Sequence, residues 1–339
     1  MLTNSRKLVG MAALGAVALA SQAAGVASVP ATCEASTGSG PAKNSAFVFI
    51  KPHANTKASQ VKVQGELARR GIKVVREGEL SGEQIDDDML IDQHYYAIAS
   101  KATLLKPNTL PVPGAKFKAA FGLEWKDALA DGVVFNAIDA CKYLGVDGAG
   151  LDAMWSKSKL SKFGGGFYCG KIEPNIPGKH KAIYVFNGFF MSMRGKFVQP
   201  GTSIHYYVVD FQPDHLSWAD FRGKVLGPTN PKDAPADSLR GSMLQEWEKL
   251  GLEAEPTVGD NCVHASASPF EGLAENMNWL GLKPAQTAFG KKLLDAGVSA
   301  ATIQDWSVDP QVKGKSLFDQ LEDLDADDCV KKCVELNQK

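Results

Sequence analysis

The chain has 339 residues, 44% of them hydrophobic and 22% charged, which is the composition of a globular protein. Its 37 Lys and Arg residues nearly balance 38 Asp and Glu residues, so no overall field favours binding to nucleic acid or to an acidic membrane. We therefore expect no nucleic acid partner, and a phosphate-binding site would require a local group of cations. The length fits one large domain or two ordinary ones.

The first 29 residues predict a targeting segment rather than a part of the fold. Arg6 and Lys7 precede an apolar run over residues 8–20, and Ala18–Leu19–Ala20 fits a small-x-small cleavage site. This pattern is typical of a secretory signal, and an organelle address or a membrane anchor stays open as an alternative. Residues 30–44 are rich in Ser, Gly, Pro and Ala and are predicted to be a linker.

Strand and helix patterns alternate after the linker. The continuous apolar run Ala46–Ile50 predicts a buried strand that ends at Lys51–Pro52. Ser81 and Gln84 have the spacing of a capping box, which marks the start of a helix. The elements predicted for this part are a strand over 46–50, a helix over 59–70, a strand over 72–80 and a helix from Ser81 through Tyr95.

Residues 101–186 differ in composition and are interpreted as a mostly helical insert, with short helices over 125–158. The insert contains Gly165-x-x-x-x-Gly170–Lys171, but Ile172 stands where a P-loop needs Ser or Thr to hold Mg²⁺. No clear strand precedes this motif and no good helix follows it. We therefore interpret the glycine-rich run as a turn.

The remaining patterns complete an α+β fold. With the insert set aside, the order of strands and helices predicts a ferredoxin-like split βαβ core, with a four-stranded antiparallel sheet and helices on one face. Residues 283–339 predict a helical C-terminal extension. The elements predicted for the second half are strands over 182–186, 204–211 and 258–263, and helices over 189–197, 218–226, 243–251 and 269–279.

Cysteines and acidic residues do not predict a metal site held by the protein. The six cysteines would permit disulfides on a secretory route, but no spacing among them resembles a zinc knuckle. Cys329 and Cys333 lie one turn apart on a predicted helix. The acidic run over 322–328 lacks the glycine and the final glutamate of a calcium loop, so we expect the solvated start of a helix.

His264 is the candidate centre of a phosphate-handling site, at the end of a predicted strand and followed by small residues. A histidine that carries a phosphoryl group needs one neutral ring nitrogen facing the phosphate and an acceptor on the other nitrogen. Glu275, on the following helix, could reach back to His264, and Ser266 could bridge the two. Cations and hydroxyls around the phosphate would supply most of the catalysis.

A lone histidine in a strand is usually structural, so the interpretation depends on an ordered series of motifs. This series resembles the nucleoside diphosphate kinase family, and the resemblance covers residues 45–100 and 187–282. The matching motifs are Ile50–Lys51–Pro52, His94–Tyr95, Phe189–Phe190, Leu226–Gly227–x–Thr229–Asn230–Pro231, Leu239–Arg240–Gly241, and Val258–Gly259–x–Asn261–x–Val263–His264–x–Ser266–x–Ser268 with Glu275.

The resemblance implies a kinase-like domain over 45–282, interrupted by the insert, that exchanges γ-phosphates between nucleoside triphosphates and diphosphates by a ping-pong route. Mg²⁺ would ride on the nucleotide phosphates. A homo-oligomer is implied, although the inserts make the family's hexamer doubtful. The implied roles are His264 as the nucleophile, Glu275 and Ser266 as its orienting partners, Lys51, Arg240 and Asn261 as contacts to phosphate or sugar, Thr229 on a phosphate oxygen, Tyr95 beside the phosphate pocket and Phe189 stacked on the base.

Several positions depart from the family pattern. Asp260 stands where the family has arginine, and Ala267 stands where it has aspartate. A family arginine falls on Gly223, next to Arg222, and extra residues lie near 244–256. Two alternatives therefore stay open beside an active kinase: a weakened domain that binds nucleotide or a partner, and a structural subunit.

Overall fold

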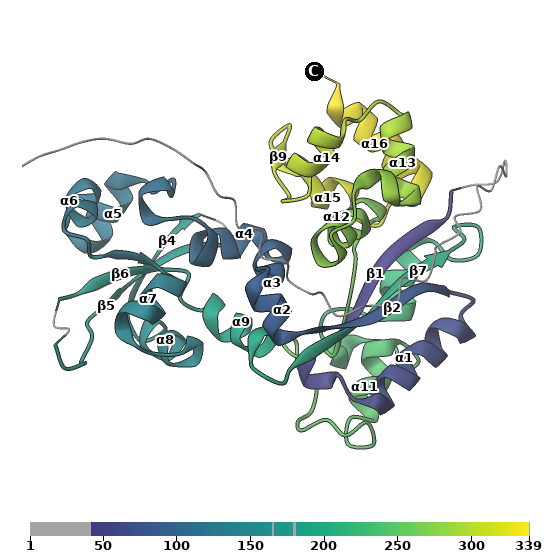
Figure 1. The fold of residues 1–339 in the computed structure, drawn as a ribbon, viewed down its shortest axis with the longest axis horizontal. Coiled ribbons are helices and arrows are strands. Elements are labelled where there is room, and N and C mark those ends of the chain that lie inside the picture. The colour runs from purple at the N-terminus through teal and green to yellow at the C-terminus, as the bar shows by residue number, and fades with distance from the viewer. Residues whose placement is uncertain (1–41, 165, 179–180, 339) are drawn as a thin grey trace, which may run out of the picture. The chain divides into compact units, whose positions relative to one another are not determined.

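The computed structural model describes residues 42–164, 166–178 and 181–338 (Figure 1). The predicted targeting segment and most of the predicted linker lie outside the described residues. In the described part, none of the helices is both long enough and apolar enough to cross a membrane.

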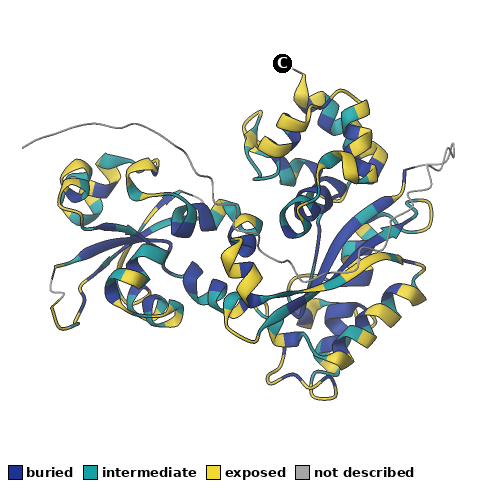
Figure 2. Ribbon diagram, viewed as in Figure 1, coloured by how far each residue is buried: buried dark blue, intermediate teal, exposed yellow. Residues whose placement is uncertain are grey.

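The first sheet has four antiparallel strands in the order β2-β7-β1-β8, which confirms the prediction of an α+β fold with an antiparallel sheet. Its central strand β1 is buried along nearly its whole length (Figure 2). Every residue of β1 pairs with β7, and its last three residues also pair with β8. The strands are β1 (Asn44–Ile50), β2 (Lys73–Ser81), β7 (Ser203–Phe211) and β8 (Val263–Ala265).

Helices cover both faces of this sheet, whereas the sequence predicted helices on one face. Alternate side chains of β1 enter two different clusters, Val48 and Ile50 on one face and Phe47 and Phe49 on the other. The continuous apolar run of β1 follows from this two-sided burial. The first face is covered by α1 (Lys57–Arg69), α10 (Trp218–Asp220) with the π-helical turn Phe221–Leu226, and α11 (Leu239–Gln245), and the second by α2 (Gly82–Asp87), α3 (Leu90–His94), α9 (Phe190–Val198) and α12 (Pro269–Leu280).

The insert has the short helices predicted over 125–158, but it also contains a second four-stranded sheet in the order β3-β6-β5-β4, most of which the sequence analysis did not predict. The glycine-rich run belongs to the hairpin of β4 and β5. A side chain at Gly170 would meet the Trp155 indole at 2.7 Å, so the ring requires glycine there. The elements are β3 (Val134–Asn136), β4 (Lys159–Gly164), β5 (Phe167–Ile172), β6 (Ile183–Phe186), α4 (Tyr96–Ala99), α5 (Gly114–Phe121), α6 (Trp125–Ala130), α7 (Ala137–Leu144) and α8 (Gly148–Trp155).

The C-terminal extension is helical, with one very short hairpin, and it packs around Phe270 and Leu273 of α12. Its acidic run lies at the exposed start of the last helix, as the sequence predicted, and within it Asp325 accepts hydrogen bonds from the Asn44 side chain and the Trp218 backbone. These contacts tie the extension to the first sheet. The elements are α13 (Ala288–Asp295), α14 (Ala300–Trp306), β9 (Gln311–Val312), β10 (Lys315–Ser316), α15 (Leu317–Leu321) and α16 (Ala326–Asn337), which carries the buried free thiols of Cys329 and Cys333.

A buried ion pair joins α3 to α9. The Arg194 Nε donates to both carboxylate oxygens of Asp92, at 3.0 and 2.9 Å, and both side chains are buried. A second carboxylate, that of Asp86, lies 2.6 Å from the same guanidinium but is half exposed. The pair fixes the helix that ends at His94 against the helix that follows Phe189.

Arg194→Ala should lower the free energy of unfolding by about 3–5 kcal/mol, because it leaves the buried Asp92 carboxylate without its partner. Urea denaturation followed by circular dichroism measures the change. Asp86→Ala is the matched control and should cost no more than about 1 kcal/mol, since its pair is exposed on one side. Equal losses in the two variants would contradict the assignment of the buried pair as the dominant contact.

Candidate functional site

His264 lies in the middle of the three-residue strand β8 (Val263–Ala265), beside Phe49 of β1. The prediction of a strand over 258–263 is therefore displaced: the residues before β8 form a loop, and Cys262 turns the chain with a φ of 69°. The His264 ring stacks on Phe49, with centroids 4.7 Å apart. Strand pairing and stacking together fix the direction of the imidazole.

Glu275 and Ser266 lie together on the Nε2 side of the His264 imidazole, which is the arrangement that the sequence analysis expected. The His264 Nε2 is 2.5 Å from Oε1 of Glu275, and the Ser266 hydroxyl donates to Oε2 at 2.5 Å. The Phe47 backbone N–H donates to the same hydroxyl at 2.9 Å, which anchors the group to β1. With Nε2–H donating to the carboxylate, Nδ1 is the nitrogen that keeps a lone pair.

The electrostatics favour a neutral imidazole. Burial, followed by the charges of Lys51 and Arg240, holds the pKa of His264 well below its usual range. Burial raises the pKa of the Glu275 carboxyl to about 8, while the Ser266 hydroxyl acts in the opposite sense. Hydrogen bonds donated by Ser266 and by Nε2–H of His264 favour the charged form of this carboxyl. The arrangement therefore favours a neutral imidazole whose Nε2 faces Glu275.

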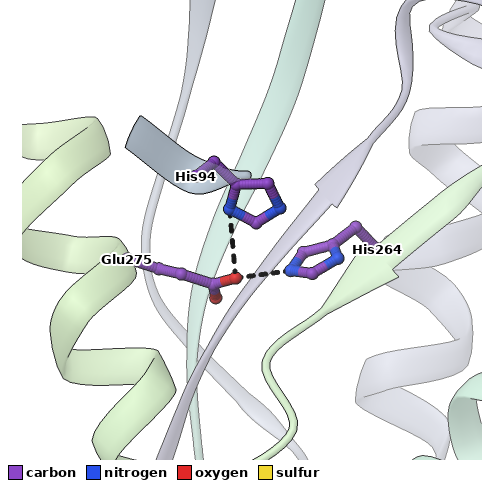
Figure 3. A group of neighbouring side chains, drawn as sticks. All are labelled: His94, His264 and Glu275. Carbon is purple, nitrogen blue, oxygen red and sulfur yellow. Dashed lines mark hydrogen bonds and ion pairs between the residues drawn. The ribbon is translucent and has the colours of Figure 1, made fainter. Parts of the chain in front are cut away.

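His94 is a site residue that the sequence analysis quoted in a motif but gave no role. Its Nδ1 lies 3.5 Å from Oε1 of Glu275, the same oxygen that faces His264 (Figure 3). The two imidazoles meet edge to face, with centroids 4.6 Å apart. Burial, followed by the neighbouring His264, holds the pKa of His94 well below its usual range. Nothing in the local sequence predicts this contact, because His94 and Glu275 belong to distant helices.

Lys51, Tyr95 and Phe189 line one cavity of about 270 Å³, as the predicted nucleotide site requires. Lys51 Nζ donates to the Gly259 carbonyl at 3.2 Å, and burial together with Arg240 lowers the pKa of Lys51 to about 8. Tyr95 also lines a second cavity, of about 190 Å³, that His264 borders. Tyr95 therefore belongs to both the cavity shared with Lys51 and Phe189, which we call the aromatic cavity, and the cavity at His264.

Arg240, Asn261 and Thr229 lie together but are engaged with the backbone. The buried Arg240 guanidinium donates to the carbonyls of Gly227 and Val263, at 2.8 and 2.9 Å. The Asn261 amide donates to the Thr229 carbonyl at 3.0 Å. A side chain at Gly227, whose φ is 87°, would meet the Ser238 hydroxyl at 2.6 Å. These contacts hold the loop before α11 against β8, so the charge of Arg240 reaches His264 from behind the strand.

Two charged residues that the sequence analysis did not assign to the site complete it. Lys196 on α9 donates to both carboxylate oxygens of Asp260, at 2.9 and 2.7 Å, at the edge of the aromatic cavity. Arg222, which also lowers the pKa of His264, pairs with Glu322 and Asp323 of the C-terminal extension, at 2.5 and 2.8 Å. Asp260, which stands where the resemblance implies an arginine, is thus neutralised by Lys196 of α9.

Comparison with solved structures finds nucleoside diphosphate kinases. Those of Encephalitozoon cuniculi, Aquifex aeolicus and Pyrobaculum aerophilum share 13%, 12% and 17% sequence identity, with TM-scores of 0.35, 0.34 and 0.31. The matches cover 71%, 70% and 70% of this chain and 90%, 95% and 96% of those chains. No protein-family model and no curated protein matches the chain. At these low TM-scores and identities the likeness carries no argument about activity.

The His264 ring should be neutral at pH 7 and carry its hydrogen on Nε2. Long-range ¹H–¹⁵N spectra of ¹⁵N-histidine-labelled protein measure the tautomer directly, and the His264→Gln spectrum identifies the signals. Lys51→Met should move the pKa of His264 upward, because it removes the largest cationic contribution to the shift. A ring that is protonated at pH 7, or that carries its hydrogen on Nδ1, would contradict the geometry.

Proposed function

We propose that the chain is a nucleoside diphosphate kinase, which moves the γ-phosphoryl group of a nucleoside triphosphate to a nucleoside diphosphate through phosphohistidine at His264. The observation that carries the proposal is the placing of the His264 ring, whose Nε2 lies 2.5 Å from Glu275 with Ser266 behind it, so that Nδ1 is left to react. The strand order β2-β7-β1-β8, in which β7 separates the two strands of a βαβ unit, supports the ferredoxin-like core that such a domain requires.

In the first step, Nδ1 of His264 attacks the γ-phosphorus, the bond to the bridging oxygen breaks, and the nucleoside diphosphate leaves with that oxygen. The ring becomes a cation as the N–P bond forms, and Glu275 stabilises it through Nε2–H. The second step reverses the first with another nucleoside diphosphate. Lys51 supplies positive charge beside the transferred group.

The aromatic cavity is assigned to the nucleoside. Phe189 offers a face for stacking, which reads any base, and Lys51 lies at the same cavity for a phosphate. Mg²⁺ would enter as part of the substrate, bound to the nucleotide phosphates. The group of three metal-ligating side chains found among the described residues contains two imidazoles, whereas Mg²⁺ prefers oxygen ligands.

A second candidate is a domain that binds nucleotide without transferring phosphate. It is favoured by the engagement of two cations, since Arg240 is bonded to backbone carbonyls and Arg222 to two carboxylates. Lys51 donates to a single carbonyl, so its ammonium group keeps more hydrogen-bonding capacity for a phosphate. In this second candidate, the two arginines contact carbonyls and acids instead of the phosphates, so the nucleotide would bind without phosphoryl transfer.

Incubation with γ-³²P-labelled ATP and Mg²⁺ should label the protein with one acid-labile, alkali-stable phosphate, which is the behaviour of a phosphohistidine. His264→Ala should abolish the label, whereas His215→Ala, at an exposed histidine away from both cavities, should retain it. Addition of unlabelled GDP should discharge the label as GTP. ATP binding without labelling would support the second candidate, and labelling that survives His264→Ala would refute the proposed nucleophile.

The kcat/KM for the nucleoside triphosphate should fall as the pH rises through about 8, because Lys51 loses its charge there. Loss of one charge-assisted bond to phosphate costs about 1.5–3 kcal/mol, or roughly ten- to hundredfold. Lys51→Arg is the control, since its guanidinium stays charged and its profile should lack this decline. Identical profiles for the two proteins would remove Lys51 from the phosphate site.

A further inference from the structure

Three potential metal ligands from separate elements meet at one point (Figure 3). They are Nδ1 of His94 on α3, Nε2 of His264 on β8 and a carboxylate oxygen of Glu275 on α12, and all lie within 4.8 Å of one another. The side chains of His94 and Glu275 are each 5% exposed and that of His264 is 17% exposed. Ser266 links Glu275 to β1 through the Phe47 backbone N–H.

Two imidazoles and one carboxylate form a donor set that suits zinc and similar borderline divalent cations. Bonds of about 2.0–2.2 Å place tetrahedral ligands roughly 3.3 Å apart. His94 Nδ1 is already 3.5 Å from Oε1 of Glu275, whereas His264 Nε2 is 2.5 Å from it. A retreat of His264 or Glu275 by about 1 Å therefore brings both nitrogen–oxygen distances to the spacing of zinc ligands.

Space for a fourth ligand lies next to the carboxylate. A cavity of about 20 Å³ is lined by His94, Glu271 and Glu275, which is enough for one water. Catalytic and regulatory zinc sites commonly hold three protein ligands and one water. The cavity is closed on the other side by Ser307 and Phe318 of the C-terminal extension.

Two carboxyl groups, those of Glu271 and Glu275, line the small cavity beside this point. Glu271 is partly buried and accepts a hydrogen bond from the Ala267 backbone N–H at 2.8 Å. Lys51, Arg240 and Arg222 are the cations that act on His264. Arg222 is already paired with two carboxylates of the extension. A dication on the Glu275 side would therefore face the two glutamates first.

We propose that His94, His264 and Glu275 form a regulatory site for a zinc-class divalent cation that excludes phosphorylation of His264. A metal on Nε2 forces the ring hydrogen onto Nδ1, through solvent, so the ring stays neutral but Nδ1 loses the lone pair that attacks phosphorus. Glu275 binds as the carboxylate and also ceases to accept from Nε2. Metal binding itself is independent of the proposed function, whereas its effect on phosphotransfer rests on it.

Trp279 provides an intrinsic probe of the site. Its Nε1–H points at Nδ1 of His94, 3.4 Å away, so a cation on that nitrogen displaces the indole N–H from its acceptor. His94→Ala and His94→Gln remove one ligand while leaving His264 and Glu275 in place. The substitution of a residue that only orients a ligand typically costs 10–100-fold in metal affinity, so loss of the ligand itself should cost more than about tenfold.

The experiment uses the full chain, stripped of metal with a chelator and titrated with buffered Zn²⁺ under equilibrium dialysis. One Zn²⁺ per chain should bind with a change in tryptophan fluorescence, and both His94 variants should weaken binding by more than about tenfold. His215→Ala should bind as the wild type does, and Mg²⁺ should not compete. Circular dichroism and thermal unfolding verify that each variant is folded.

Labelling with γ-³²P-ATP in buffered Zn²⁺ tests the regulatory consequence. Zn²⁺ should suppress labelling of the wild type relative to its metal-free level, and should change the labelling of folded His94→Gln far less when this is measured against the variant's own metal-free level. Binding of Zn²⁺ that is unchanged in both His94 variants, or no stoichiometric binding, overturns the site. Binding that depends on His94 in a protein that is never labelled supports the site and refutes only the kinase proposal.

Discussion

The buried Glu275 carboxylate is the contact on which the site depends. One of its oxygens faces two imidazoles and the other accepts from Ser266, so four segments of the chain converge on one charge. Placing a carboxylate in a protein interior is unfavourable unless donors surround it. The same requirement orders the site, because the His264 ring on β8 and the Ser266 hydroxyl that follows it must both reach the carboxylate. A small movement of α12 would disturb every one of these contacts.

The position of β1 explains how those segments are brought together. Phe47 and Phe49 face α3 and α12, while Val48 and Ile50 face α1 and α11, so β1 is fixed from both sides. His264 is held in place because it pairs with Phe49 of this strand. The Arg194–Asp92 pair extends it to α9, which carries Lys196. The chemistry therefore depends on a strand whose own residues take no part in it.

Local patterns in the sequence predicted the core elements and the partners of His264, but not contacts between distant segments. The apolar run at β1, the capping box at Ser81 and the spacing from His264 to Glu275 are short-range signals. The sheet of the insert pairs β3 with β6, fifty residues apart, and its short strands include two glycines, Gly164 and Gly170. Val258 resembled a strand residue, yet it is exposed and the chain turns at Cys262. Nothing in the acidic run over 322–328 predicted that its first two residues, Glu322 and Asp323, would pair with Arg222.

The insert and the extension form part of the candidate site rather than separate additions. Asp152 of α8 lines the aromatic cavity beside Ser192, and Ser307 and Phe318 line the cavity at His264. A side chain at Gly148 would meet the Met191 carbonyl at 2.4 Å, so α8 must approach α9 through glycine. Asp260 binds Lys196, and Glu322 and Asp323 bind Arg222, so two cations of the candidate site are paired with acids. The site thus combines an imidazole held in one orientation with cations that are already partly neutralised. Under the proposed function, phosphotransfer would be limited by charge at the phosphates rather than by the position of the histidine.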